Sequence, residues 1–144
     1  AYDPATSGAS MRWIAILPSS ASSTVAFIRS FDRGATWATA GTWPTANGKP
    51  KHAVGIPGTP GAFFVISSNG FYKVTNAFGT PVIARITVNP DAPSREPWGN
   101  IFVSGDGQTV QVSLTSQGVW RSTTGGASGS SARRQRRAWH RPGR

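Results

Sequence analysis

Short apolar runs, separated by residues that favour turns, occupy the middle of the chain. The runs are rich in Val, Ile, Phe and Tyr, which favour strands, and Asn69-Gly70 between the second and third runs is typical of a tight hairpin turn. No stretch has the apolar spacing of a helix. The pattern predicts four consecutive antiparallel strands at residues 52–56, 62–67, 71–75 and 81–88.

The segments on either side repeat this arrangement. Before it, strands are expected at residues 11–17, 24–30 and 36–42, with an inner strand that is either absent or contained in the first ten residues. After it, strands are expected at residues 100–103, 109–115 and 119–122, and no outer strand follows them. The chain is therefore expected to be all-β, with three successive groups of strands.

A compact turn motif joins the last two strands of the first group. Residues 29–37 read Arg-Ser-Phe-Asp-Arg-Gly-Ala-Thr-Trp, in which Asp32 can accept hydrogen bonds from N–H groups of the turn. Glycine at position 34 allows a positive φ, and the indole of Trp37 can cover the hairpin. We expect a structural role for the whole motif: Ser30, Asp32, Gly34, Thr36 and Trp37.

The motif recurs in two degenerate copies, in which Asn76 and Thr124 take the place of Asp32. The basic residue before each copy recurs after 44 and then 48 residues, close to the roughly 40 to 50 residues of a four-stranded blade of a β-propeller. This period predicts a partial propeller of about three four-stranded antiparallel blades, with the last blade incomplete, at residues 11–43, 52–88 and 99–128. Since propellers close with roughly four to eight blades, missing blades or self-association would be needed to close the ring.

The pattern Ser-x-Asp-x-Gly-x-Thr-Trp at residues 30–37 resembles the Asp box of BNR-repeat, sialidase-like propellers. These include sialidases, xyloglucanase-type glycoside hydrolases, sortilin-type receptors and photosystem II assembly factors. Residues 49–72 are closest in pattern to the xyloglucanase-type enzymes. The resemblance implies a fragment of a secreted glycoside hydrolase that acts on a plant-type β-glucan such as xyloglucan, inactive alone.

No residue matches the catalytic aspartates of those enzymes by motif, so catalytic residues are not assigned. The Arg-Ile-Pro motif and arginine triad of sialidases, and the cysteines of sortilin-type domains, also have no counterpart. The alternative is a noncatalytic propeller that binds glycan or protein, either lectin-like or an assembly factor.

The candidate ligand contacts lie in the two connections between successive blades. In these connections, carboxylates and an arginine could hydrogen-bond sugar hydroxyls, and an indole offers a flat apolar face. The other interpretation is a long connection stiffened by prolines, with its charges solvated. The candidates are Asp91, Arg95, Glu96, Trp98 and Trp43.

Charge and composition narrow the kinds of partner and cofactor that we expect. The net charge is +10, but six of the fifteen basic residues lie at positions 133–144, so the basicity is local and we expect no nucleic-acid partner. Residues 129–144 are expected to form a disordered Arg-rich tail, with an anion- or RNA-binding arm around Trp139 as the alternative. The chain has no cysteine and only two distant histidines, so no metal or other cofactor is expected, and no apolar run is long enough for a membrane span.

Overall fold

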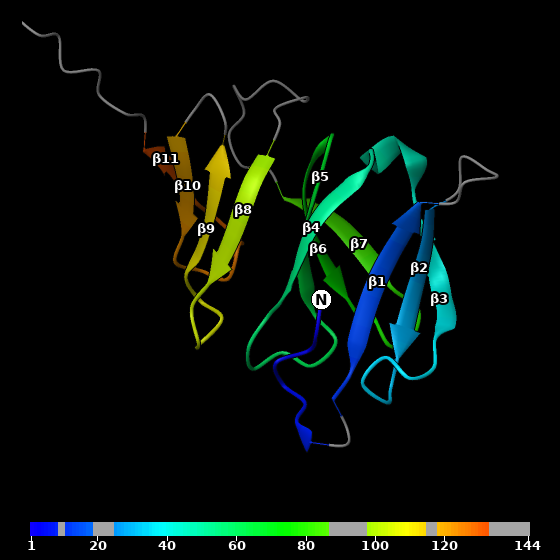
Figure 1. The fold of residues 1–144 in the computed structure, drawn as a ribbon. Coiled ribbons are helices and arrows are strands. Elements are labelled where there is room, and N and C mark those ends of the chain that lie inside the picture. Colours follow the sequence, from blue (N-terminus) through cyan, green and yellow to red (C-terminus); the bar gives the residue numbers. More distant parts are fainter. Residues whose placement is uncertain (9–10, 19–24, 87–97, 115–117, 133–144) are drawn as a thin grey trace, which may run out of the picture.

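The computed structural model describes residues 1–8, 11–18, 25–86, 98–114 and 118–132 (Figure 1). These residues form strands β1 to β11 and contain no α-helix. A short 3-10 helix, η2 (Thr45–Asn47), precedes β4. The expected all-β class is therefore confirmed.

The strands form three antiparallel sheets, and within each sheet every strand pairs with its neighbour in the sequence. The first sheet contains β1 (Trp13–Pro18), β2 (Val25–Ser30) and β3 (Ala38–Trp43). The middle sheet contains β4 (Pro50–Gly55), β5 (Phe63–Ser67), β6 (Gly70–Thr75) and β7 (Val82–Ile86). The third sheet contains β8 (Trp98–Val103), β9 (Val110–Leu114), β10 (Gly118–Ser122) and β11 (Ser130–Ala132).

The third sheet has an outer strand that the sequence did not predict. Strand β11 pairs antiparallel with β10, with Val119 opposite Ala132 and Arg121 opposite Ser130. The prediction of a missing outer strand and a disordered tail from residue 129 is therefore wrong for these residues. Gly129 lies so close to the indole of Trp120 that a Cβ at this position would be 2.3 Å from the ring. This close approach accompanies the pairing of residues 130–132 with the edge of β10. Residues 133–144 lie outside the described part.

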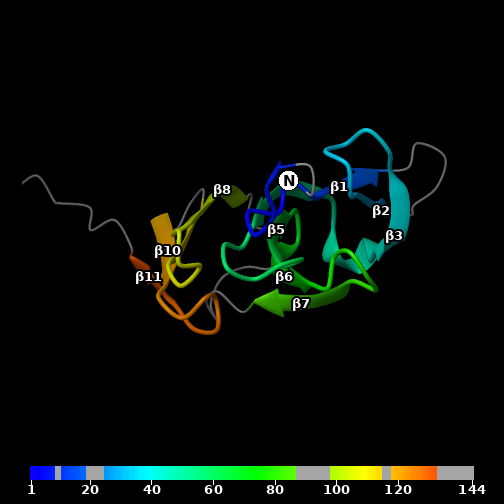
Figure 2. The same ribbon diagram turned by 90° about the horizontal axis from the view of Figure 1, so that it is seen from below.

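The three sheets lie side by side and enclose two apolar clusters (Figures 1 and 2). Alternation along β5 explains the arrangement, because successive side chains of a strand point to opposite faces. Phe63 and Val65 belong to the cluster shared with the first sheet, whereas Phe64 and Ile66 belong to the cluster shared with the third. Strand β5 is thus buried on both faces, as its uninterrupted apolar run at residues 62–66 requires.

Aromatic rings connect the sheets through these clusters. Between the first and middle sheets, the rings of Trp43 and Tyr72 meet edge-on with centroids 5.2 Å apart. Between the middle and third sheets, Phe71 stacks on Phe64 at 5.3 Å and meets Trp120 edge-on at 5.8 Å. Burying each of these side chains stabilises the fold by about 1.5–3 kcal/mol, so the clusters hold the sheets together.

The first sheet has three strands, and the N-terminal residues cover part of its free edge. Ala1 and Ile14 exchange two backbone hydrogen bonds of 2.8 Å, and the N–H of Asp3 donates to the carbonyl of Arg12 at 2.8 Å. The Asp3 carboxylate is buried and accepts hydrogen bonds from the backbone N–H groups of Ala5 and Gly61. Among the described residues, residues 1–3 therefore stand where the inner strand of this sheet was expected, and they pair with residues 12–14.

Candidate functional site

The connections between strands alternate between two ends of the sheets (Figure 1). One end carries the Asp32 turn motif and its two degenerate copies. The other end carries η2 and the turn between β5 and β6. We name these the box end and the loop end, and each is a candidate location for a functional site.

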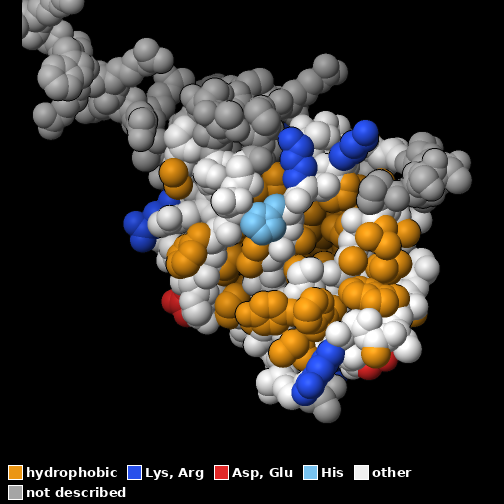
Figure 3. All heavy atoms as spheres, viewed as in Figure 1, with side chains coloured by type: hydrophobic (Ala, Val, Ile, Leu, Met, Phe, Trp, Pro, Cys, Tyr) orange, Lys and Arg blue, Asp and Glu red, His pale blue; other side chains and the backbone are white. Residues whose placement is uncertain are grey.

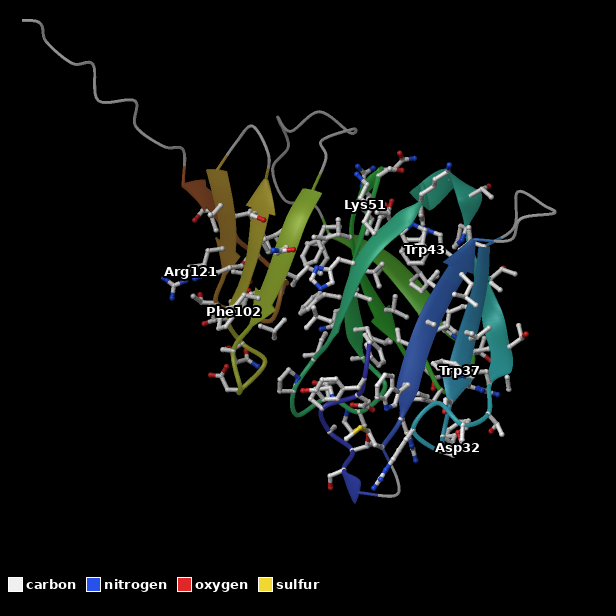
Figure 4. All side chains as sticks on the ribbon, viewed as in Figure 1. Asp32, Trp37, Trp43, Lys51, Phe102 and Arg121 are labelled. Carbon is white, nitrogen blue, oxygen red and sulfur yellow. The ribbon has the colours of Figure 1, made fainter. Side chains whose placement is uncertain are left out.

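At the box end, Asp32 is fully engaged by its own turn (Figure 4). Its carboxylate accepts hydrogen bonds from the Thr36 hydroxyl at 2.5 Å, the Thr36 N–H at 2.9 Å and the Ser30 hydroxyl at 2.7 Å. These bonds, the Thr36 hydroxyl first, lower the pKa of Asp32 from 3.8 to about 2. The indole N–H of Trp37 donates to the Gly34 carbonyl at 2.9 Å. The five motif residues form one hydrogen-bonded corner, as a structural motif should.

The third sheet repeats this corner without a carboxylate. The Thr124 hydroxyl accepts the Ser128 N–H at 3.0 Å, as Asp32 accepts the N–H four residues after it. The Ser122 hydroxyl accepts the N–H groups of Thr124 and Gly126, at 3.2 and 3.0 Å. In the middle sheet Asn76 occupies the equivalent position with a positive φ of 52° and donates to the Thr80 carbonyl at 3.1 Å. A neutral side chain is thus sufficient for the turn.

The described carboxylates all accept hydrogen bonds within the fold. Asp3 and Asp32 are engaged as above. Asp106 accepts hydrogen bonds from the Ser104 hydroxyl and the Gln108 N–H, and these bonds lower its pKa. Because sugar hydrolysis usually needs two carboxyl groups on either side of the bond that breaks, the described residues supply no such pair.

The predicted ligand contacts have different outcomes. Asp91, Arg95 and Glu96 lie outside the described residues, and so does the side chain of Trp98, whose backbone begins β8. Trp43 is 1% exposed, packs on Tyr72 and donates its indole N–H to the Gly48 carbonyl at 2.8 Å (Figure 4). The Trp43 ring therefore has no free face for a sugar, because it closes the core beneath the loop end.

At the loop end of the middle sheet, hydrogen bonds join the 44–49 connection to residues 67–69. We call these residues the loop-end platform, which the sequence did not predict. The side-chain amide of Asn69 donates to the Ala46 carbonyl at 3.0 Å, the Lys49 N–H donates to the Ser68 hydroxyl at 3.0 Å, and the Ser67 hydroxyl donates to the Asn47 carbonyl. These bonds tie the 44–49 connection to the turn between β5 and β6. The only signal in the sequence was the polar run Ser67-Ser68-Asn69, which could equally have been an ordinary turn.

Three cationic side chains come from residues of this platform or next to it. Lys49 belongs to the tied connection, and Lys51 follows it on β4 with its side chain exposed at the loop end (Figure 4). Arg85 donates to the Asn69 carbonyl at 3.2 Å from β7. Cationic side chains beside a hydrogen-bonded loop suit the recognition of hydroxyl or anionic groups.

A groove of about 100 Å³ separates β1 from β4. Apolar side chains lie around much of the hollow on this face (Figure 3), and the polar side chains among its lining residues are those of Lys51 and His52. The lining residues are Ala1, Ile14, Ala15, Ile16, Pro50, Lys51, His52, Ala53 and Val65. The groove therefore combines an aliphatic floor with two hydrogen-bonding side chains at one end.

No protein-family model matches this chain, and no curated protein matches it. Among the described residues, no helix is long and apolar enough to cross a membrane. Groups of three or more His, Cys, Asp or Glu side chains able to hold a metal ion are also absent from the described part.

Proposed function

We propose that this chain forms three consecutive blades of an Asp-box β-propeller that binds carbohydrate without hydrolysing it. The observation that carries the propeller is the recurrence of one hydrogen-bonded corner, at Asp32 and Thr124, between the last two strands of the first and third sheets, which flank the middle sheet. In this proposal the three sheets are the blades, the protein is secreted, and further blades or further copies close the ring.

The engagement of the carboxylates favours binding over catalysis. Asp3, Asp32 and Asp106 each accept hydrogen bonds from nearby backbone or hydroxyl groups, which leaves none of them as a general acid or nucleophile. The platform at the loop end supplies the donors that a glycan site needs. Its position agrees with the expectation that loops between blades form the ligand face.

A glycan-binding measurement tests this proposal. The protein is titrated with xyloglucan oligosaccharides in a calorimeter, and release of reducing ends is followed in parallel. We expect binding without release of reducing ends, and Lys51→Ala to weaken binding at least about threefold through loss of one donor. Arg121→Ala is the matched control, because Arg121 is exposed on β10 in the third sheet. Absence of binding to all glycans on an array would refute the proposal.

A glycoside hydrolase is the second candidate, and it is supported by the xyloglucanase-type pattern of residues 49–72. Its acids would be Asp91 and Glu96, the two carboxyl residues not used by a described turn. Xyloglucan hydrolysis by the gene product that contains this chain, abolished by Asp91→Asn or Glu96→Gln, would favour the hydrolase. Equal turnover in both variants and the parent protein would exclude these residues as the acids.

A further inference from the structure

Two arginines and two phenylalanines gather at the box end, between the first and middle sheets. The guanidinium carbon of Arg12 lies 5.5 Å from the centroid of the Phe31 ring and 5.6 Å from that of Phe78, and the two ring centroids are 5.7 Å apart. The guanidinium carbon of Arg29 also lies 5.5 Å from the Phe31 centroid. We call these four residues the arginine cluster.

The other two sheets form their corners without such a cluster. The strand register matches the sheets residue by residue at this end, where β1 pairs with β2, β5 with β6 and β9 with β10. The turn needs neither a guanidinium nor a ring at the positions of Arg12 and Phe31. Those positions hold Ala62 and Thr75 in the middle sheet, and Thr109 and Thr123 in the third.

The two guanidinium groups keep unused hydrogen-bond donors. Among the described residues, the side chain of Arg12 has no acceptor and no ion-pair partner, and its nitrogens are open to solvent. Arg29 is held in place through Nη1, which donates to the carbonyl of Phe78 and, at 3.0 Å, to that of Gly79. Its Nε is buried without an acceptor, and no described carboxylate neutralises its charge. The cluster therefore holds two positive charges in place and leaves the donors of Arg12 free.

The surroundings of these charges favour a carboxylate as the ligand. A guanidinium stays charged at all ordinary pH values, and its planar fork matches a carboxylate or a phosphate. The Asp32 carboxylate is adjacent in the sequence to Phe31 and is ionised at neutral pH, so it repels a doubly charged phosphate more than a singly charged carboxylate. The Phe31 side chain is 48% exposed and offers apolar surface to the methylene groups of an acidic side chain.

We propose that the arginine cluster binds an acidic peptide segment of a partner protein, whose carboxylate accepts hydrogen bonds from Arg12 beside the charge of Arg29. The proposal is independent of the glycan proposal, because the cluster lies at the box end and the glycan platform at the loop end. Antiparallel pairing of Ala1 with Ile14 directs any residue before Ala1 along β1 toward the loop end, away from the cluster.

Titration with a synthetic peptide tests the proposal. The probe has the sequence Gly-Glu-Gly-Glu-Gly, is acetylated and amidated, and is added to the whole chain. We expect saturable NMR shifts of the Arg12 Nε–H signal and of the Phe31 ring signals. The same peptide with glutamine at both acidic positions should bind at least about tenfold more weakly, because it offers no charge to the guanidinium groups.

Substitutions of equal charge provide the protein-side control. Arg12→Gln should weaken binding of the acidic peptide at least about tenfold. Arg121→Gln removes the same charge at the position of the third sheet that corresponds to Arg29, and it should leave binding unchanged. The glutamine peptide keeps the test decisive if Arg12→Gln fails to fold.

Three results would overturn the proposal. One is the absence of saturable shifts at Arg12. Another is an equal loss of binding in Arg12→Gln and Arg121→Gln, which would show attraction to net charge alone. The third is tighter binding at Arg12 of inorganic phosphate or of oligogalacturonate than of the acidic peptide, which would assign the cluster to a different class of ligand.

Discussion

Replacing Phe64 with alanine should loosen the third sheet from the middle one. The Phe64 side chain is 0% exposed and its ring stacks on Phe71 with centroids 5.3 Å apart. Gly126 of the third sheet lies against it, since a Cβ on that glycine would be 3.1 Å from the ring. Removing a buried phenylalanine costs about 3–5 kcal/mol, out of a total stability of roughly 5–15 kcal/mol for a domain.

Phe63, the neighbouring residue on β5, provides a control that tests which of the two flanking sheets is loosened. Phe63 is equally buried but belongs to the cluster shared with the first sheet. Native-state hydrogen exchange should therefore show lost protection at β9 and β10 for Phe64→Ala and at β2 for Phe63→Ala. Phe102→Ala, at a side chain that is 58% exposed, should change stability by less than about 0.5 kcal/mol.

Urea unfolding followed by tryptophan fluorescence gives the magnitude. A cost below about 1 kcal/mol for Phe64→Ala would refute the two-cluster description, because a buried ring packed against two sheets cannot be removed so cheaply. The same exchange pattern in both variants would refute the assignment of alternate β5 residues to opposite faces.

Three further predictions concern single interactions. The lowered pKa of Asp32, about 2 against an ordinary 3.8, means that its ionised form stabilises the fold above pH 3.8 and that this contribution is lost as the pH falls toward 2; an NMR titration midpoint near 4 would contradict this, and Asp32→Asn should flatten the fall of Tm over this range. Gly48→Ala should be more destabilising than Gly58→Ala in thermal melts, because both glycines have φ near 74° but only the first Cβ would clash, at 2.3 Å from a serine oxygen; equal losses would count against the tight loop-end platform. Asp3→Ala should cost about 1–3 kcal/mol by urea unfolding, because it leaves the buried N–H of Gly61 without its acceptor, and a neutral result would show that water replaces the carboxylate.

The strands of the middle sheet were predictable because local signals agree with the fold. Alternation and the Asn69-Gly70 turn placed β5 and β6 within a residue of their observed bounds. The Asp32 corner was predictable for the same reason, since its hydrogen bonds join residues at most four positions apart.

Features that depend on distant residues were not predictable. Strand β11 has no apolar pattern, and the close fit of Gly129 over Trp120 that accompanies its pairing with β10 leaves no local signal in the sequence. Trp43 was predicted to be a ligand contact in the connection between two blades, but its indole is buried against Tyr72. Asp3 looked unremarkable in the sequence, because its partner Gly61 is 58 positions away.

The double-sided burial of β5 has a consequence for the unfolded chain. Residues 62–67 are uncharged, contain no proline and are mostly aromatic or β-branched, a composition that stacks readily into cross-β fibrils once water reaches it. In the native molecule the backbone of β5 is hydrogen-bonded to β4 and β6, and the neighbouring sheets cover its side chains. Heating should therefore end in precipitation rather than recovery on cooling, and the working lifetime of the protein will be set by how fast this strand is uncovered.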